Sequence, residues 1–172
     1  MPLEIERKFL VENDSWRDLV KGPPAHFTQG YLALGDEHSP EVRIRLSRTL
    51  LPRTTLAHEE AFITAKSRGD AVREEVEATI SPASARTMLA ACVCVLEKTR
   101  YRVPEKSGLV FEIDVYHGPL DGLVLAEIEL PDESAPFDME VGFLGTEVTT
   151  DLAYKNAIMA RTGRPAAPRR KM

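Results

Sequence analysis

The sequence has few cysteines and no long apolar run. Cys92 and Cys94 are its only cysteines, and two residues this close make neither a disulfide framework nor a CxxC pair for zinc or redox chemistry. No segment approaches the roughly 20 apolar residues that cross a membrane, and residues 1–8 are too charged for a secretory signal. These absences predict a reduced, cytoplasmic protein with no membrane partner.

A surplus of basic residues is also missing. The chain has 22 Lys and Arg against 27 Asp and Glu, a formal net charge of −5. Nucleic-acid-binding proteins usually show the opposite balance, so we expect no nucleic-acid partner. Residues 163–172 are a local exception, with basic side chains among Pro and Ala, and are expected to form a disordered tail. Residues 1–162 have the length and composition of one globular domain.

Several nucleotide-binding and hydrolase motifs are absent. The sequence contains no GxxxxGK[ST] loop, no GxGxxG after a strand and no GxSxG elbow. Its 4 histidines are scattered without the spacing of metal ligands, which disfavours zinc.

Segments with alternating apolar and polar residues are plentiful. This alternation predicts eight strands, near residues 3–11, 27–34, 41–50, 59–66, 72–80, 95–103, 109–117 and 124–130. Many short strands in one domain indicate a barrel or a strongly curved antiparallel sheet. The predicted fold is therefore α+β, an eight-stranded antiparallel β-barrel with helices packed outside.

Two helices are predicted with clear boundaries. Ser81-Pro82 supplies an N-cap and a first-turn proline for a helix that continues to Cys92. A second helix is expected from Thr150 to the stop at Gly163. Shorter helices are expected at residues 14–20 and around 134–140.

Charged residues recur at i, i+2 spacing in most of the predicted strands. Alternation places each such pair on one side of its strand. The carboxylates in this set are Glu4, Glu6, Glu75, Glu77, Glu112, Asp114, Glu127 and Glu129. The bases are Lys8, Arg43, Arg45, Lys66, Lys98 and Arg100. Each pair taken alone is consistent with a solvated strand face, but their regularity favours a charged lumen.

A charged lumen restricts the ligand that it can bind. Buried charges are costly unless they are paired or bound to ligand. A polyanion would meet the bases, and a hard divalent cation would bridge phosphate oxygens to the carboxylates. The pattern therefore predicts a phosphate-rich ligand bound with Mg²⁺ or Mn²⁺.

The motifs resemble those of the CYTH domain, the triphosphate tunnel metalloenzymes. The N-terminal Glu4-x-Glu6-x-Lys8 resembles the family's E-x-E-x-K signature, and the other matching motifs follow in the family's order. They are Gln29-Gly30-Tyr31-Leu32, Arg43-Ile44-Arg45, Thr64-x-Lys66, Arg73-x-Glu75-x-Glu77, Glu97-Lys98-Thr99-Arg100-Tyr101, Phe111-Glu112-Ile113-Asp114, Glu127-Ile128-Glu129, Val148-Thr149 and Tyr154-Lys155-Asn156. The resemblance covers residues 2 to 160 and implies an eight-stranded tunnel that acts on triphosphates with Mg²⁺ or Mn²⁺.

The resemblance also implies roles for individual residues. The triphosphate would be bound by Lys8, Arg43, Arg45, Lys66, Lys98, Arg100 and Lys155. The metal ligands would be Glu4, Glu6, Asp114, Glu127 and Glu129. Glu75, Glu77 and Glu112 would orient the bases or only pair with them. Tyr31 and Lys98 match a catalytic dyad beside the attacking water, although Tyr31 is equally consistent with a packed aromatic residue.

Among the activities in this family, we expect hydrolysis of inorganic tripolyphosphate to pyrophosphate and phosphate. The short chain and its start, Ile5-Glu6-Arg7-Lys8-Phe9, look most like small bacterial inorganic triphosphatases. Alternatives are a class IV-type adenylyl cyclase, a nucleoside or thiamine triphosphatase, and a non-catalytic module that binds polyphosphate or nucleotide. The resemblance leaves a homodimer open.

Overall fold

The computed structural model describes residues 5–34, 40–50, 57–66, 75–132 and 134–166. The chain forms two compact units: unit 1 comprises Met1–Gly22 and Thr99–Met172, and unit 2 comprises Pro23–Lys98. Each unit has its own apolar core.

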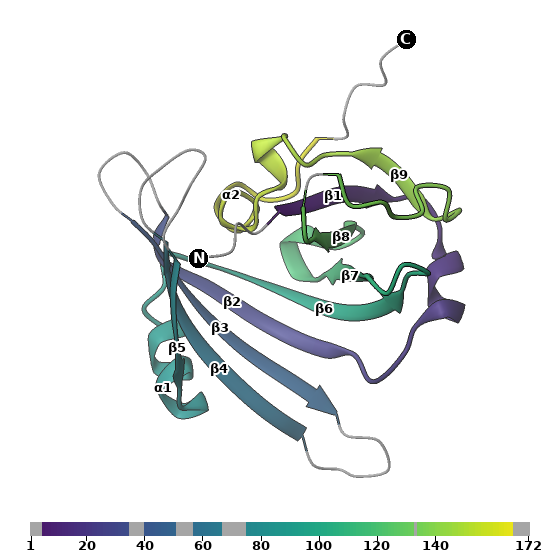
Figure 1. The fold of residues 1–172 in the computed structure, drawn as a ribbon. Coiled ribbons are helices and arrows are strands. Elements are labelled where there is room, and N and C mark those ends of the chain that lie inside the picture. Colours follow the sequence, from purple (N-terminus) through teal and green to yellow (C-terminus); the bar gives the residue numbers. More distant parts are fainter. Residues whose placement is uncertain (1–4, 35–39, 51–56, 67–74, 133, 167–172) are drawn as a thin grey trace. The chain divides into compact units, whose positions relative to one another are not determined.

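Within the described residues, nine strands form one sheet in the order β5-β4-β3-β2-β6-β7-β8-β1-β9 (Figure 1). They are β1 (Ile5–Val11), β2 (Ala25–Leu34), β3 (Glu41–Leu50), β4 (Ala57–Lys66), β5 (Glu75–Ile80), β6 (Cys94–Pro104), β7 (Val110–Tyr116), β8 (Val124–Leu130) and β9 (Leu144–Glu147). Pairing is antiparallel for β1–β8, β1–β9, β2–β3, β3–β4, β4–β5 and β7–β8. The predicted α+β class is confirmed. The eight predicted strands are present, and β9 is an additional one.

The helices are shorter than the sequence indicates. They are the 3-10 helices η1 (Asp14–Leu19), η2 (Gly118–Leu120) and η3 (Leu152–Tyr154) and the α-helices α1 (Pro82–Leu89) and α2 (Asn156–Thr162). In α1 the Ser81 hydroxyl accepts from the backbone N–H of Ser84 at 3.0 Å, as an N-cap should. No helix among these described elements is long and apolar enough to span a membrane.

Two helix predictions are wrong. The helix expected from Thr150 to Gly163 is interrupted at Lys155, whose extended backbone (φ −70°, ψ 133°) ends η3 and precedes α2. The helix expected around 134–140 is absent from the described residues there. Asp132 and Asp138 accept the backbone N–H groups of Ser134 and Glu140, and such local bonds compete with helix formation.

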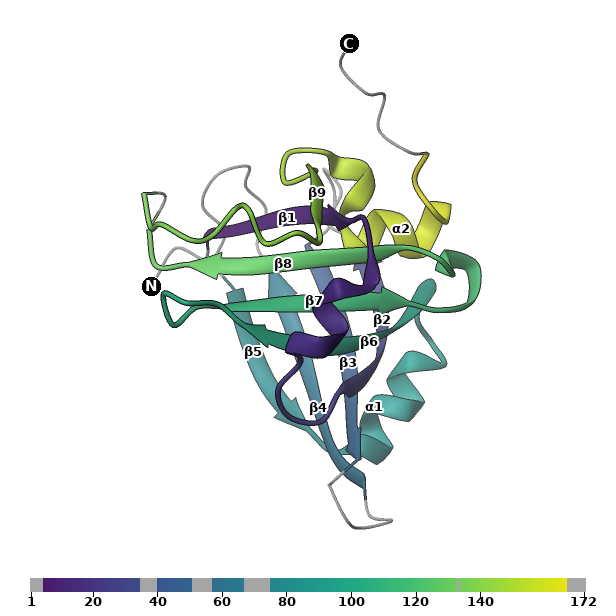
Figure 2. The ribbon, with the colours of Figure 1, turned by 90° about the vertical axis from the view of Figure 1, so that its right-hand side faces the viewer.

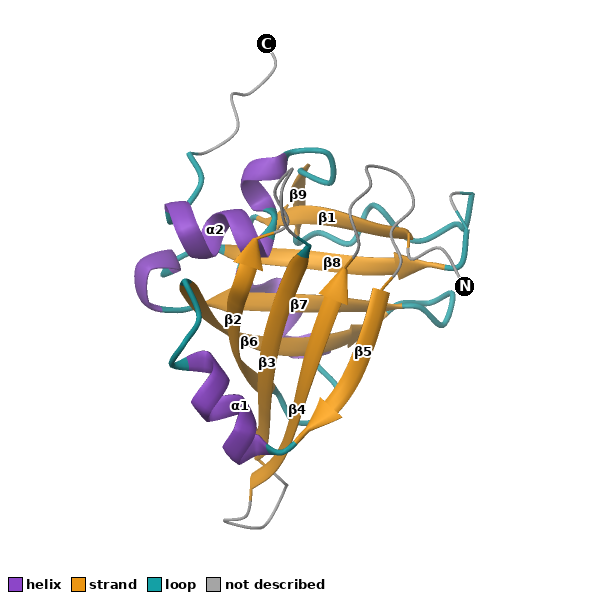
Figure 3. Cartoon of the chain, turned by 90° about the vertical axis from the view of Figure 1, so that its left-hand side faces the viewer, coloured by secondary structure: helices purple, strands orange, loops and turns teal. Residues whose placement is uncertain are grey.

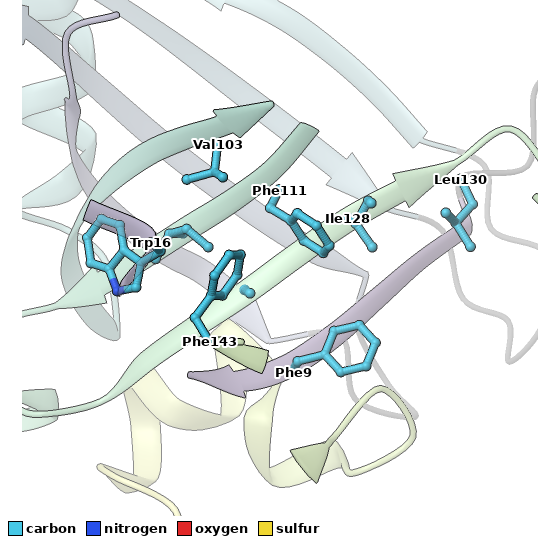
Figure 4. Packing of buried hydrophobic residues seen from close by; sticks show 9 residues of the cluster. Phe9, Trp16, Val103, Phe111, Ile128, Leu130 and Phe143 are labelled. Carbon is cyan, nitrogen blue, oxygen red and sulfur yellow. The ribbon is translucent and has the colours of Figure 1, made fainter. Parts of the chain in front are cut away.

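In unit 1, β8 lies between β1 and β7 (Figure 2). The core of this unit lies on the side of the three strands that carries their apolar residues. Phe111 and Phe143 pack edge to face with ring centroids 5.6 Å apart. Trp16 of η1 is fully buried (Figure 4). Its ring centroid lies 5.1 Å from that of Tyr101. This packing leaves the opposite side of the three strands for their charged residues.

The core of unit 2 lies between α1 and the sheet (Figure 3). Ile44 of β3, Ala61 of β4 and Ala85 of α1 form its buried centre. Gly30 of β2 faces the segment after α1 so closely that a Cβ there would lie 2.6 Å from Cys92 Sγ. One face of the sheet is thus covered, and the alternate residues of the same strands point to the other face.

The expected basic tail lies mostly outside the described residues, at 167–172. Before it, the Arg164 guanidinium donates to the Asp121 carbonyl at 3.0 Å, and the Tyr154 hydroxyl donates to the Ala166 carbonyl at 3.3 Å. The chain therefore makes defined contacts with unit 1 as far as Ala166.

Candidate active site: two charged sheet faces

The face of β2–β5 opposite α1 carries the predicted bases of unit 2. In the strand register, Tyr31 lies opposite Arg43, and Arg43 lies opposite Thr64. Gln29 lies opposite Arg45 in the same way. Directly paired residues in antiparallel strands share a face, so the register itself brings these polar side chains together. We call the polar and charged side chains on this side of β2–β5 the charged face of unit 2.

Arg43 is surrounded by oxygen atoms on this face. Its Nη2 donates to Thr64 Oγ1 at 3.1 Å and lies 3.8 Å from Glu75 Oε1 and 3.7 Å from Glu77 Oε2. Thr64 in turn donates to Glu77 at 2.9 Å. Arg43 Nε is buried and has no hydrogen-bond acceptor among the residues described. An unsatisfied buried donor of this kind is unfavourable and is suited to an incoming anion.

Glu75 and Glu77 act here as counter-ions of the bases. Glu75 Oε2 lies 2.9 Å from Lys66 Nζ, and both carboxylates lie near the Arg43 guanidinium. The structure thus shows the pairing that the sequence left open for these two residues. Arg73, the first residue of the motif that contains these two carboxylates, lies outside the described residues.

Tyr31 and Gln29 are both buried on this face. Gln29 Nε2 donates to the Tyr31 hydroxyl at 2.5 Å, while Arg45 Nε donates to Gln29 Oε1 at 3.2 Å. Burial raises the pKa of Tyr31 far above its usual value, and the charge of Glu41 adds to the shift. Tyr31 is therefore a neutral phenol at physiological pH. Lys98, on β6, is also buried, with 1% of its surface exposed.

Arg100 is the centre of the charged face of unit 1, formed by the charged residues of β1, β6, β7 and β8. Its Nε and Nη2 bind the two oxygens of Asp114 at 2.7 Å each, and Nη2 also lies 2.8 Å from Glu127 Oε2. Its Nη1 donates to Glu112. Despite burial, which opposes the charged form, these carboxylates raise the pKa of Arg100 well above its normal value. Glu112 is therefore an ion-pair partner of Arg100.

Lys8 occupies the neighbouring position on β1. Its Nζ lies 2.9 Å from Glu127 Oε1 and 3.8 Å from Glu6 Oε1. Burial lowers the pKa of Lys8, but the charges of Glu127 and Glu6 outweigh it, and the pKa is raised. Glu127 therefore contacts both Lys8 and Arg100.

The remaining predicted metal ligands lie toward solvent. Glu6 and Glu129 are exposed and stand directly opposite each other in the β1–β8 register. Like charges in this position repel, and a divalent cation would offset the repulsion. Glu4 lies outside the described residues, and among those described no three acidic, histidine or cysteine side chains form a group that could hold a metal ion as they stand. Lys155 is exposed.

Two polar residues to which the sequence assigned no role are central to these contacts. Gln29 and Thr64 are both completely buried. Each bridges an arginine to another side chain, Gln29 from Arg45 to Tyr31 and Thr64 from Arg43 to Glu77. The available signal was their i, i+2 spacing from Tyr31 and Lys66, within the motifs that already contain them.

Two curated relatives match nearly the whole chain. An inorganic triphosphatase of Acetivibrio thermocellus is 33% identical over 165 residues, covering 94% of this chain and 95% of the relative. An inorganic triphosphatase of Nitrosomonas europaea is 36% identical over 159 residues, covering 91% and 96%. The crystal structure of the inorganic triphosphatase NE1496 superposes with a TM-score of 0.63 at 31% identity, covering 93% of this chain and 95% of that one. No family model matches the chain.

Identity above 30% over almost the full length of both relatives establishes the family. The chain belongs to the inorganic triphosphatases, the group that the motifs of its charged strands resemble.

Proposed function

We propose that the protein hydrolyses inorganic tripolyphosphate to pyrophosphate and phosphate. The observation that supports this most directly is the basic row Arg43, Arg45 and Lys66 on one sheet face, with the buried Arg43 Nε lacking an acceptor among the described residues. A row of cations with an unsatisfied donor fits a chain of phosphate groups. The two inorganic triphosphatases among the relatives specify an inorganic triphosphate.

In this proposal the phosphate-binding groups are the bases Lys8, Arg43, Arg45, Lys66, Lys98, Arg100 and Lys155. Most of the described bases are paired with carboxylates, as Lys66 is with Glu75 and Lys8 with Glu127. Phosphate binding would exchange some of these ion pairs for contacts to the substrate.

A divalent metal, Mg²⁺ or Mn²⁺, fits the donor chemistry of the unit 1 face. Its ligands would be drawn from Glu4, Glu6, Asp114, Glu127 and Glu129, which offer the hard oxygen atoms that these ions prefer. The opposed Glu6 and Glu129 support this assignment, because a cation would relieve their repulsion. When bound, the metal would neutralise phosphate charge and orient phosphate oxygens.

The reaction would be attack of water on a terminal phosphorus, breaking one P–O–P bond and releasing phosphate and pyrophosphate. The transition state spreads negative charge over the phosphoryl oxygens, so fixed cations are the main source of acceleration. Arg43 and Arg45 would supply that charge. Tyr31 stays protonated because its pKa is raised, so it would donate a hydrogen bond, and Lys98 would be the group that accepts the proton of water.

The test is phosphate release from tripolyphosphate, ATP and thiamine triphosphate, each with Mg²⁺, Mn²⁺ or EDTA. We expect metal-dependent cleavage of tripolyphosphate that is lost in Lys98→Ala and Glu6→Ala. Cyclic AMP with pyrophosphate from ATP would instead identify a cyclase. Preferred cleavage of ATP or thiamine triphosphate would identify an organic triphosphatase, and tight binding with no turnover would identify a binding module.

Location and partners stay predictions. We propose that the protein acts in the cytoplasm on a small-molecule triphosphate, without nucleic-acid or membrane partners, and that it can form a homodimer. Sedimentation of the purified chain would test the last point.

A further inference from the structure

Gln29 is an uncharged polar residue buried inside the charged face of unit 2. None of its surface is exposed, and both ends of its amide group are hydrogen bonded. A buried amide without hydrogen-bond partners would be strongly unfavourable. Gln29 is therefore held where it is by Arg45 on one side and Tyr31 on the other.

The orientation of the Gln29 amide follows from the chemistry of its neighbours. A guanidinium group can only donate hydrogen bonds, so the atom that faces Arg45 Nε at 3.2 Å must be the amide oxygen. The amide nitrogen then faces the Tyr31 hydroxyl at 2.5 Å and donates to it. Arg45 thus determines which end of the Gln29 amide faces the Tyr31 hydroxyl.

This orientation fixes what the Tyr31 hydroxyl can do. Its oxygen accepts the hydrogen bond from Gln29, so its own proton must point away from Gln29. Burial keeps the phenol protonated by raising its pKa. The Arg45 guanidinium carbon also lies 5.5 Å from the ring centroid of Phe27, a contact that limits how far the arginine can turn.

We propose that Gln29 is a positioning residue that links Arg45, a phosphate-binding group, to Tyr31 and holds the phenol as a hydrogen-bond donor toward the substrate. The inference rests on the proposed triphosphatase activity and adds a residue to it. Gln29 acts through Tyr31 and makes no contact with substrate of its own.

Steady-state kinetics of a double-mutant cycle test this role. Tripolyphosphate hydrolysis with Mg²⁺ is measured for the wild type, Gln29→Met, Tyr31→Phe and the double variant. We expect each single variant to lower kcat by about tenfold or more. The double variant should be no slower than Tyr31→Phe within about twofold, because Gln29 has no effect once the phenol is gone.

Two further variants keep the result interpretable. Gln29→Glu retains an acceptor for Arg45 but offers no donor to Tyr31, so its kcat should fall by the factor expected for Gln29→Met. It therefore tests the role of Gln29 if Gln29→Met does not fold. Thr28→Val changes the neighbouring residue on the opposite side of β2 and should leave kcat within about twofold of the wild type.

The outcomes separate the inference from the function on which it rests. Losses that multiply in the double variant, or a wild-type kcat in Gln29→Glu, would overturn the role of Gln29 while leaving the triphosphatase activity intact. A wild-type protein that releases no phosphate from tripolyphosphate would overturn the proposed function, and the role of Gln29 with it.

Discussion

Arg100 is the residue whose loss should destabilise the protein most strongly among the predicted phosphate-binding bases. It binds Asp114 through two hydrogen bonds of 2.7 Å, reaches Glu127 at 2.8 Å and also contacts Glu112. Asp114 has no exposed surface, and the Arg100 side chain is 13% exposed. Replacing Arg100 with Met would leave a buried carboxylate and its acidic neighbours without this cation.

The expected loss is large because one partner of a buried ion pair is removed and the other remains. Such a change destabilises proteins by about 3–5 kcal/mol. For a domain of this size that corresponds to a fall in Tm of roughly 6–20 °C, at about 2–4 °C per kcal/mol.

Thermal and urea unfolding at neutral pH measure this effect. Arg102→Met is the matched control, because Arg102 lies on the same strand with an exposed side chain, and it should change stability by less than about 0.5 kcal/mol. Adding Asp114→Asn to Arg100→Met should restore part of the loss, since the most buried charge is then neutral. A loss below about 1 kcal/mol in Arg100→Met would refute the argument.

Three further substitutions have distinct expected outcomes. Arg45→Ala should lower tripolyphosphate hydrolysis by about a hundredfold or more, because it removes a proposed phosphate-binding cation together with its hydrogen bond to Gln29. Gly30→Ala should lower the free energy of unfolding by about 1–3 kcal/mol, because the new Cβ would lie 2.6 Å from Cys92 Sγ, and Cys92→Ala should recover part of that loss. Glu147→Gln should lower stability by about 0.2–1 kcal/mol at neutral pH, because the hydrogen bond from Arg7 holds the pKa of Glu147 below its usual 4.5. That stabilisation is present above pH 4.5 and is lost as the pH falls through the lowered value, so the variant and wild type should converge in strong acid.

Each of these outcomes has a result that would contradict it. An unchanged rate of tripolyphosphate hydrolysis in Arg45→Ala would exclude Arg45 as a phosphate-binding group. Equal losses of unfolding free energy for Gly30→Ala with and without Cys92→Ala would show that a clash with Cys92 is not the cause. Glu140→Gln, at an exposed position, is the control for Glu147→Gln, and a stability difference for Glu147→Gln that does not change with pH would exclude the ion pair as its source.

The strands and their charged sides were predictable because strand alternation is a local property. Arg43 and Arg45 share a side of β3 whatever the strand pairs with. β9, by contrast, has only four residues, and its antiparallel pairing with β1 is a long-range contact. The break at Lys155 was equally hidden, because the run from Leu152 to Met159 has helical spacing and only the backbone of the folded chain shows the interruption.

The ion pairs on the charged faces could not be predicted from the sequence, because they depend on the register between strands. Alternation places Glu75, Glu77 and Glu112 on the side of their strands that carries charge, but only the pairing of β4 with β5 brings Glu75 to Lys66. Gln29 and Thr64 were overlooked for a related reason. The i, i+2 pattern singles out charged side chains, whereas a neutral buried side chain can act by fixing the orientation of a charged one.

Register also separates the four described acids among the five that the sequence grouped as metal ligands. Asp114 and Glu127 are bound by Arg100 and Lys8, so coordination of a metal by these carboxylates would have to replace strong ion pairs. Glu6 and Glu129 are exposed and directly opposed, an arrangement that a divalent cation would stabilise. We therefore expect Glu129→Gln to weaken metal activation with little change in Tm, and Asp114→Asn to lower both, because only Asp114 also holds Arg100 in place. Metal titrations of hydrolysis alongside thermal unfolding would distinguish the two, and equal losses of stability in both variants would contradict this division of roles.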